Sequence, residues 1–287
     1  MTVLFFCVGA AKAGTSWLHR QLADHPECHF RAIKELHFFD AVDGGRLDRQ
    51  IDNHRAQQLV LKDRLATQGA PATASQKRRL ADRAEWLEVL GRGDDTDAYL
   101  EYLHRGANPG QVVGDMTPAY ALLSEDRLGN MARLTSDVRI LYLLRDPVER
   151  LWSHIRMIAA RRDDNGVVTA RRCANILRRV FKGDEDQIAM RSDYAGALAR
   201  LSVAVPGARL LVDVFEDMIA GPGLDRICDF LGIARVAAGA VPVHAGQDLA
   251  MTPEQRQAAA AYLAPQYDAA VRALGQMPAA WDRKGLL

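Results

Sequence analysis

The chain has 287 residues and a formal net charge of +1, a length that suits one large α/β domain or two small ones. The near-neutral charge argues against nucleic acid or a membrane surface as a partner, and no apolar run reaches membrane-spanning length. The four cysteines are scattered and form no C-x-x-C pair, which favours reduced thiols in a cytoplasmic protein over a disulfide framework or a zinc site.

The first predicted strand, Val3 to Val8, runs directly into a glycine loop. No basic segment precedes this strand, so we interpret it as part of the core and not as a signal peptide. Strand, glycine loop and helix together direct backbone N–H groups at an anion. We therefore predict a phosphate-type anion site, against the alternative of a simple turn with a solvated Lys12. The loop and the start of its helix read Gly9-Ala10-Ala11-Lys12-Ala13-Gly14-Thr15-Ser16-Trp17.

This loop differs from a Walker A sequence at one decisive position. Gly9, Gly14 and Ser16 have the spacing of G-x-x-x-x-G-K-[ST]. Thr15 stands where that motif has its lysine, and the lysine lies inside the loop as Lys12. The loop is thus P-loop-like without being a standard Walker A motif.

Two segments follow the first helix. Phe30 to Asp40 embeds Lys34, Glu35 and His37 among apolar residues, either as an amphipathic surface segment or as a segment returning to the mouth of the loop. Residues 41–110 are polar, with helices predicted near 47–65 and 76–91. We interpret 41–110 as a helical insertion that could cover the substrate side of one domain spanning 1–287.

The remaining elements alternate between strands and helices, which predicts an α/β fold with a mostly parallel central sheet and helices on both faces. Asp146 is predicted to cap one of the helices, with Glu149 completing a capping box. The Arg-rich stretch from Arg156 to Arg191 is interpreted mainly as a solvated region, with an anionic substrate surface as the alternative. The predicted strands lie at Gln111–Pro118, Val138–Leu144 and Arg209–Phe215, and the predicted helices lie near 124–135, after Asp146, at 193–204, at 225–231 and from Thr252 to Leu274 with a break near Pro265.

The end of the Val138–Leu144 strand argues against magnesium-dependent chemistry. A Walker-type enzyme needs an acidic residue there to hold Mg²⁺, but this strand ends at Arg145. An arginine can instead bind a phosphate with two parallel hydrogen bonds, and Ser153 on the next helix offers a hydroxyl. The sequence thus offers two anion-binding groups, Lys12 with its loop and Arg145 with Ser153, and no expected metal. Such a pair would fit a nucleotide with phosphates at both ends of its ribose.

These residues resemble a known family, the sulfotransferases that use 3′-phosphoadenosine-5′-phosphosulfate (PAPS). The loop from Gly9 to Leu18 is similar to their 5′-phosphosulfate loop, and Arg145 to Ser153 is similar to their 3′-phosphate motif. Lys34-Glu35-Leu36-His37-Phe38-Phe39-Asp40 and Asp115-Met116-Thr117-Pro118-Ala119-Tyr120 resemble segments of the heparan-sulfate-modifying branch and its bacterial relatives. Ser192-Asp193-Tyr194 and Phe230-Leu231-Gly232 also lie where the family has related segments.

The resemblance implies PAPS as sulfuryl donor, leaving as 3′,5′-ADP, and no metal. It implies a cofactor site made of Gly9, Ala11, Lys12, Ala13, Gly14, Thr15, Ser16, Trp17, Arg145 and Ser153. Two positions depart from the family pattern, because Asp115 and Met116 stand where the second segment has glutamate and lysine. A closing loop at His244–Leu249 is only a guess.

Sulfuryl transfer needs charge stabilisation on the leaving group and a base for the acceptor. Lys12 would stabilise the leaving group, Glu35 would be the base, and Lys34 would hold sulfonate oxygens or tune Glu35. His37 and Asp115 remain alternative bases, and burial beside Phe38 and Phe39 would help Glu35 by raising its pKa. The expected acceptor is a hydroxyl or amine of a carbohydrate or a small hydroxylated metabolite. A P-loop kinase and a non-catalytic nucleotide-binding protein are the alternative functions.

Overall fold

The computed structural model describes residues 2–239 and 249–282 of the chain. In this part, five parallel strands form one sheet in the order β2-β3-β1-β4-β5. β1 is central and every one of its residues is buried, which explains its uninterrupted apolar sequence. The strands are β1 Leu4–Gly9, β2 Cys28–His29, β3 Val112–Asp115, β4 Val138–Leu144 and β5 Leu210–Val214.

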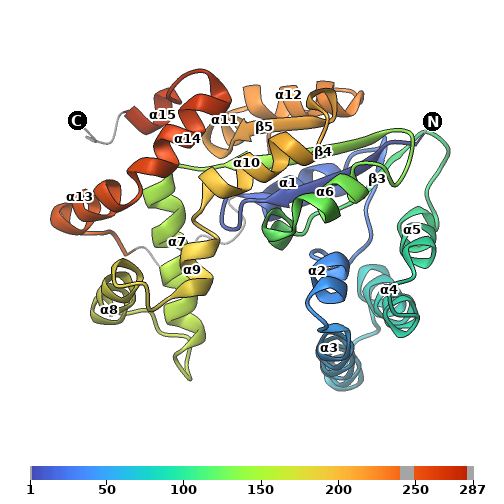
Figure 1. Ribbon diagram of the computed structural model, residues 1–287. Coiled ribbons are helices and arrows are strands. Elements are labelled where there is room, and N and C mark those ends of the chain that lie inside the picture. The colour runs from blue at the N-terminus through green and yellow to red at the C-terminus, as the bar shows by residue number, and fades with distance from the viewer. Residues whose placement is uncertain (1, 240–248, 283–287) are drawn as a thin grey trace.

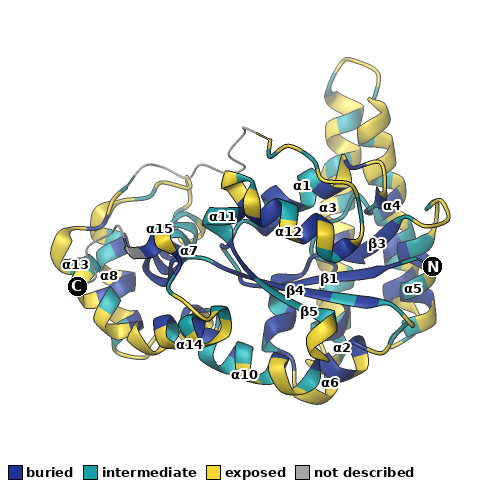
Figure 2. Ribbon diagram, turned by 90° about the horizontal axis from the view of Figure 1, so that it is seen from above, coloured by how far each residue is buried: buried dark blue, intermediate teal, exposed yellow. Residues whose placement is uncertain are grey.

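Helices cover both faces of the sheet, which confirms the predicted α/β class. Figure 2 shows α1, α11 and α12 on one face and α6 and α10 on the other. No helix of the described residues is long and apolar enough to cross a membrane. The α-helices are α1 Thr15–Ala23, α2 Phe38–Asp43, α3 Leu47–Thr67, α4 Ala74–Gly91, α5 Thr96–His104, α6 Glu125–Met131, α7 Pro147–Arg161, α8 Ala170–Phe181, α9 Asp186–Met190, α10 Tyr194–Ala204, α11 Phe215–Ala220, α12 Pro222–Leu231, α13 Pro253–Tyr262, α14 Ala264–Leu274 and α15 Ala279–Asp282, with 3₁₀ turns η1 Pro118–Leu122 and η2 Gly207–Arg209.

Residues 41–110 contain three helices between β2 and β3. α3 and α4 lie side by side and project away from the sheet (Figure 1). α3 is largely exposed, with His54 as its buried residue, whereas α4 and α5 bury Trp86, Tyr99 and Tyr102 in the core. The inserted helices are therefore joined to the core through α4 and α5.

Two groups of helices extend from the same side of the sheet (Figure 1). We call α2 with α3, residues 38–67, the insertion arm. The second arm consists of the C-terminal half of α7 together with α8 and α9, residues 154–190. Both arms are important below because a cavity lies between them.

Several local details differ from the sequence predictions, and the short helices α2, α5, α8 and α9 were not predicted. β2 was not predicted, because two residues are too few to give a periodic signal. The capping box at Asp146 is only half formed. Asp146 accepts from the Glu149 N–H at 2.9 Å, but the Asp146 N–H donates to Glu216 at 3.1 Å, and the Glu149 carboxylate accepts from Arg256 at 2.6 Å.

The Arg-rich stretch is also more structural than predicted. Arg162 and Arg179 both donate to Glu185, whose side chain is only 6% exposed, at 2.7 and 2.9 Å. These two arginines therefore join α8 and the end of α7 to the start of α9. Solvation alone does not account for them.

Candidate functional site

The glycine loop places an open helix N-terminus at the carboxyl end of β1. Lys12 and Gly14 have left-handed backbones, with φ of 72° and 82°, and these turns bring the chain into α1. Gly14 caps α1 without a side chain, and the first turn carries no carboxylate. Trp17 and Leu18 donate their N–H groups to the Gly14 carbonyl, whereas the N–H groups of Thr15 and Ser16 have no partner inside the helix and create a positive end. This geometry supports the predicted anion site.

Glycine is required at Gly14 by packing as well as by backbone conformation. A Cβ at this position would come within 2.3 Å of Phe215 Cδ2, and one at Gly9 within 2.5 Å of Tyr142 Cε2. The neighbouring Ala13 and Trp17 are buried. The side chains of Phe215 and Tyr142 thus pack tightly against the loop, and this packing fixes the backbone that would contact a ligand.

Arg145 contacts this loop, so the two predicted anion-binding groups are neighbours. Its Nη1 donates to the Lys12 carbonyl at 3.2 Å, and its guanidinium lies over the Phe215 ring at 4.9 Å. Tyr194 holds the backbone of Arg145 from both sides, because its hydroxyl accepts from the N–H at 3.2 Å and donates to the carbonyl at 2.9 Å. The Arg145 Nε is buried without a hydrogen-bond partner among the described residues.

The same place concentrates positive charge. Burial lowers the pKa of Lys12, and repulsion from Arg145 lowers it further. Ser153 lies half-buried on α7, the helix that follows Arg145. An anion between these groups would relieve the repulsion and give the buried Nε a partner, so the residues present fit a phosphorylated nucleotide.

Arg150 is a loop-supporting residue that the sequence analysis missed. It is fully buried on α7, donates to the Ala11 carbonyl at 3.4 Å, and bonds to the Ser192 hydroxyl. Its signal in the sequence was weak, since an arginine near the start of an amphipathic helix usually faces solvent. Arg150 lies within the Arg145–Ser153 segment that resembles the family's 3′-phosphate motif, but the sequence analysis assigned it no role.

Glu35 lies in a strained segment between two cations. Its φ is 63°, its carboxylate is paired with Lys34, and His37 Nε2 is 3.8 Å away. Desolvation raises the pKa of Glu35, but attraction to the His37 and Lys34 cations outweighs it and lowers the pKa to about 2. Burial therefore acts in the expected direction, but the two neighbouring cations reverse the net shift.

His37 is a cation that pairs with the carboxylate of Asp40. Its Nδ1 is 2.9 Å from Asp40 Oδ2. Burial lowers the pKa of His37, but the hydrogen bond to Asp40 and the charge of nearby Glu35 raise it to about 9. A histidine protonated at neutral pH cannot accept a proton, which argues against His37 as the base.

Asp115, the other alternative base, is enclosed and fully engaged. It is 2% exposed and accepts from the hydroxyls of Thr117 at 2.7 Å, Tyr120 at 2.7 Å and Tyr99 at 3.1 Å. It also lies 3.5 Å from the Leu36 N–H, the peptide that follows Glu35. This geometry suits a carboxylate that positions the Glu35 segment. Met116, at the family's lysine position, is buried.

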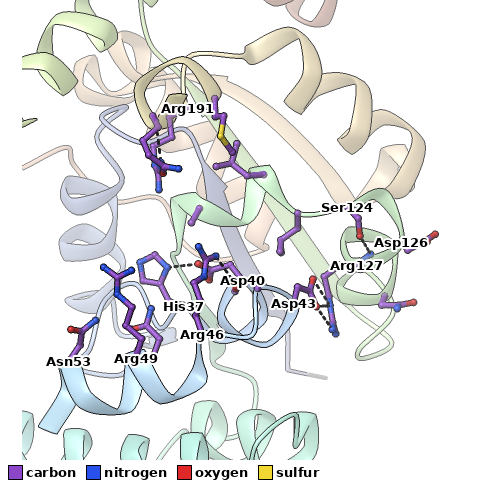
Figure 3. Close-up of a pocket in the computed structure, with 18 of the residues that line it drawn as sticks. His37, Asp40, Asp43, Arg46, Arg49, Asn53, Ser124, Asp126, Arg127 and Arg191 are labelled. Atoms are coloured by element: carbon purple, nitrogen blue, oxygen red, sulfur yellow. Dashed lines mark hydrogen bonds and ion pairs between the residues drawn. The ribbon is translucent and has the colours of Figure 1, made fainter. Parts of the chain in front are cut away.

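A cavity of about 1030 Å³ lies between the two arms and beside the Glu35 segment. Figure 3 shows His37, Arg46 and Arg49 on the insertion arm and Arg191 on the opposite side. A narrower cavity touches Ala10 and Ala11 of the loop and shares Leu122, Met190 and Arg191 with the large one. The narrow cavity therefore lies between the large cavity and the glycine loop.

Two further points complete the local description. Among residues 2–239 and 249–282, no three His, Cys, Asp or Glu side chains gather into a group that could hold a metal ion. The guessed closing loop at His244–Leu249 falls outside the described residues except for Leu249, whose carbonyl accepts from Trp152 Nε1 at 2.6 Å.

The fold and the loop define an α/β protein with an anion site at the carboxyl end of a parallel sheet. Residues 5–237 match the sequence model of the sulfotransferase family, and the chain belongs to that family. Membership supports a sulfotransferase activity. No curated protein is significantly similar to the chain in sequence.

Solved structures are similar in fold. A crystal structure of a sulfotransferase from Alicyclobacillus acidocaldarius superposes with a TM-score of 0.61 at 22% identity, covering 97% of this chain and 98% of that one. The sulfotransferase domain of the Synechococcus PCC 7002 olefin synthase has a TM-score of 0.42 at 16% identity, with 81% and 73% covered. The sulfotransferase domain from the curacin biosynthetic pathway has a TM-score of 0.45 at 18% identity, with 81% and 74% covered.

Proposed function

We propose that the protein is a PAPS-dependent sulfotransferase that acts on a hydroxyl or amine of a carbohydrate or a small hydroxylated metabolite. The observation that carries the proposal is the contact of Arg145 with the Lys12 carbonyl. Through this contact, the Lys12 loop and Arg145 would form one anion-binding site at the N-terminus of α1. A Walker-type kinase would need an acidic residue in place of Arg145.

The donor would lie along the carboxyl ends of β1 and β4. The loop amides, Lys12, Thr15 and Ser16 would hold its 5′ phosphate, and Arg145 with Ser153 would hold its 3′ phosphate. When bound, the nucleotide supplies an activated sulfuryl group with a phosphate as leaving group. Lys12 would stabilise the charge that grows on that phosphate, an effect typically of about 2.7–4 kcal/mol.

Glu35 remains the proposed base, but it must first be released from its cations. With a pKa of about 2 it is a weak proton acceptor in the free protein. Lys34 is the cation best placed to leave, since it could turn from Glu35 to a sulfonate oxygen when donor binds. His37 would then keep Glu35 oriented, with Asp40 fixing the imidazole ring.

We further propose that residues 1–287 form a single domain with an insertion at 41–110. Support comes from the buried core, which continues from β1 through Phe38 and Phe39 to Tyr99 and Trp86 without interruption. Under this proposal the insertion shapes the acceptor side of the site.

Calorimetry without metal tests the proposed donor. We expect 3′,5′-ADP to bind without Mg²⁺ and ATP to bind weakly. Tight ATP binding that requires Mg²⁺, with none for 3′,5′-ADP, would instead identify a P-loop kinase. Binding of 3′,5′-ADP without transfer of labelled sulfonate from PAPS to any hydroxyl or amine in an acceptor screen would favour a non-catalytic nucleotide-binding protein.

A further inference from the structure

The cavity between the two arms is lined by an excess of positive charge. Its lining in the described chain includes five arginines and the protonated His37, against three carboxylates. Two of the carboxylates are already neutralised, because Asp43 pairs with Arg127 and Asp40 pairs with His37. The third, Asp126, is exposed in the first turn of α6, where the helix N-terminus favours it.

Four arginines of this lining form no ion pair with any residue in 2–239 or 249–282: Arg46, Arg49, Arg161 and Arg191. Arg46 donates to the backbone carbonyl of Asp40 at 3.0 Å, and Arg191 donates to the Gln187 backbone at 3.1 Å and to its side chain at 2.6 Å. These partners are neutral, so they orient the guanidinium groups without cancelling their charge. Arg46 and Arg191 are thus held in place, and Arg49 and Arg161 are exposed, so all four charges are available to an anion.

The charges come from both walls of the cavity. Arg46 and Arg49 belong to the insertion arm, whereas Arg161 ends α7 and Arg191 follows α9. Figure 3 shows Arg49 and Arg191 on opposite sides of the opening. Repulsion across the cavity is strong enough to contribute to a lowered pKa of Arg191, after burial, from Arg161 and Arg46. Like charges brought together in this way cost stability unless an anion is bound between them.

We propose that the acceptor carries a fixed anionic group in addition to its reacting hydroxyl or amine, and that Arg49 and Arg161 bind this group from opposite walls. This inference rests on the proposed sulfotransferase function, which makes the cavity the acceptor site. The chemical class is a carboxylated, phosphorylated or sulfated alcohol or sugar. The cavity is at the upper end of the usual size of small-molecule sites, about 300–1,000 Å³.

The test measures anion binding directly and does not depend on sulfuryl transfer. Sucrose octasulfate is the anionic probe and sucrose is the neutral control, titrated by calorimetry in 0.15 M NaCl with saturating 3′,5′-ADP. The nucleotide occupies the loop, so binding that remains must lie elsewhere. We expect the octasulfate to bind, sucrose not to bind, and Arg49→Gln or Arg161→Gln to weaken the octasulfate about tenfold or more, as for loss of a charge-assisted hydrogen bond.

Two exposed arginines provide matched controls with the same change in net charge. Arg55 lies on α3, as Arg49 does, but does not line the cavity, and Arg171 lies on the neighbouring α8. Arg55→Gln and Arg171→Gln should change the affinity less than twofold. Failure of the octasulfate to bind, or equal losses in control and cavity variants, would overturn the proposal. Failure of 3′,5′-ADP to bind would count against the donor assignment alone, because octasulfate binding could still be measured without it.

Discussion

At the scale of single residues, the site separates binding from chemistry. Arg145 contacts the loop and, under the proposed assignment, would bind a phosphate that does not react, whereas Glu35 lies next to His37, which lines the cavity. A contact that is equal in ground and transition states changes affinity, and one made only during reaction changes turnover. Variants at the two positions should therefore have different kinetic signatures.

Glu35→Gln keeps the shape of the side chain and removes the proposed base. We expect kcat to fall by roughly 10²–10⁴ while the affinity for 3′,5′-ADP stays nearly the same. Steady-state kinetics and calorimetry on the same preparation measure both quantities. Near-full turnover in this variant would remove Glu35 from the mechanism.

Arg145→Ala should weaken 3′,5′-ADP binding by about 1.5–3 kcal/mol, the usual range for a hydrogen bond to a charged group. Because Arg145 also supports the Lys12 carbonyl, Arg145→Lys is the control that keeps the charge without the planar fork. The lysine variant should lie between parent and alanine in calorimetry. Unchanged affinity in the alanine variant would exclude Arg145 from the nucleotide site.

His37 gives a pH dependence with a defined direction. Its pKa, about 9, lies above the ordinary value of about 6.5, so its pairing with Asp40 and Glu35 stabilises the folded chain fully below about pH 6.5. That contribution is lost as the pH rises through about 9. Asp40→Asn should lower the pKa of His37 toward its ordinary value, as measured by NMR titration of the imidazole protons.

The control for this titration is Asp43→Asn. Asp43 belongs to the same helix as Asp40 but pairs with Arg127, so this variant should leave the His37 titration in place. A parent protein in which His37 titrates near 6.5 would contradict the assignment of His37 as a permanent cation.

At the scale of elements, the junction of β1 with α1 determines whether an anion can bind at all. Gly14 combines a φ of 82° with a Cβ position that collides with Phe215. The first turn of α1 can therefore form in this orientation only with glycine at its cap. Loop geometry and nucleotide binding should be lost together.

Gly14→Ala should destabilise the fold by at least about 1–2 kcal/mol, the cost of a left-handed alanine, and should abolish detectable 3′,5′-ADP binding. Gly69→Ala is the matched control, since Gly69 has a φ of 66° with no atom within 4 Å of the added Cβ. It should show a similar conformational cost in chemical denaturation but normal nucleotide binding. Normal binding by Gly14→Ala would mean that the loop tolerates another path.

At the scale of the whole molecule, the insertion supports the segment that carries Glu35, the proposed base. Asp82 on α4 is 4% exposed and accepts from Arg31 Nε at 2.5 Å, from the Ile33 N–H at 3.0 Å and from Tyr102 at 3.1 Å. The chain reaches Glu35 two residues after Ile33. The position of Glu35 therefore depends on a helix about fifty residues further along the sequence.

Asp82→Asn should reduce the free energy of unfolding by about 1–3 kcal/mol, since Glu85 still pairs with Arg31. It should also lower kcat, because the segment that carries Glu35 loosens. Asp63→Asn, an exposed position on α3, is the control and should affect neither quantity. If denaturation and kinetics showed a stability loss with unchanged kcat, Asp82 would be only a packing residue.

The parts of this molecule that could be predicted are those with local signals. β4 has its predicted bounds, because an apolar run ended by a charge and a proline is readable along the chain. The Lys12 loop was recognisable from spacing, although its contact with Arg145 joins residues 133 positions apart. Tertiary contacts of that kind leave no periodic trace in a sequence.

The net pKa shift of Glu35 could not be predicted from the sequence. Sequence suggested an apolar neighbourhood from Phe38 and Phe39, and those rings are indeed buried. Left-handed backbones at Glu35 and His37, however, turn the two side chains toward one another. A pKa depends on such directions, which residue types alone do not specify.

The division of the cavity between two arms has a consequence for divergence within the family. Under the proposed assignment, donor recognition lies on the sheet edge at Lys12 and Arg145, while the cavity charges lie on exposed helices such as α3. Substitutions at Arg49 or Asn53 therefore meet few packing constraints and leave the loop untouched. Proteins that descend from one ancestral chain could therefore change their acceptor through substitutions at surface positions alone. A laboratory library of substitutions confined to the α3 wall of the cavity should yield new acceptor preferences without loss of the folded core.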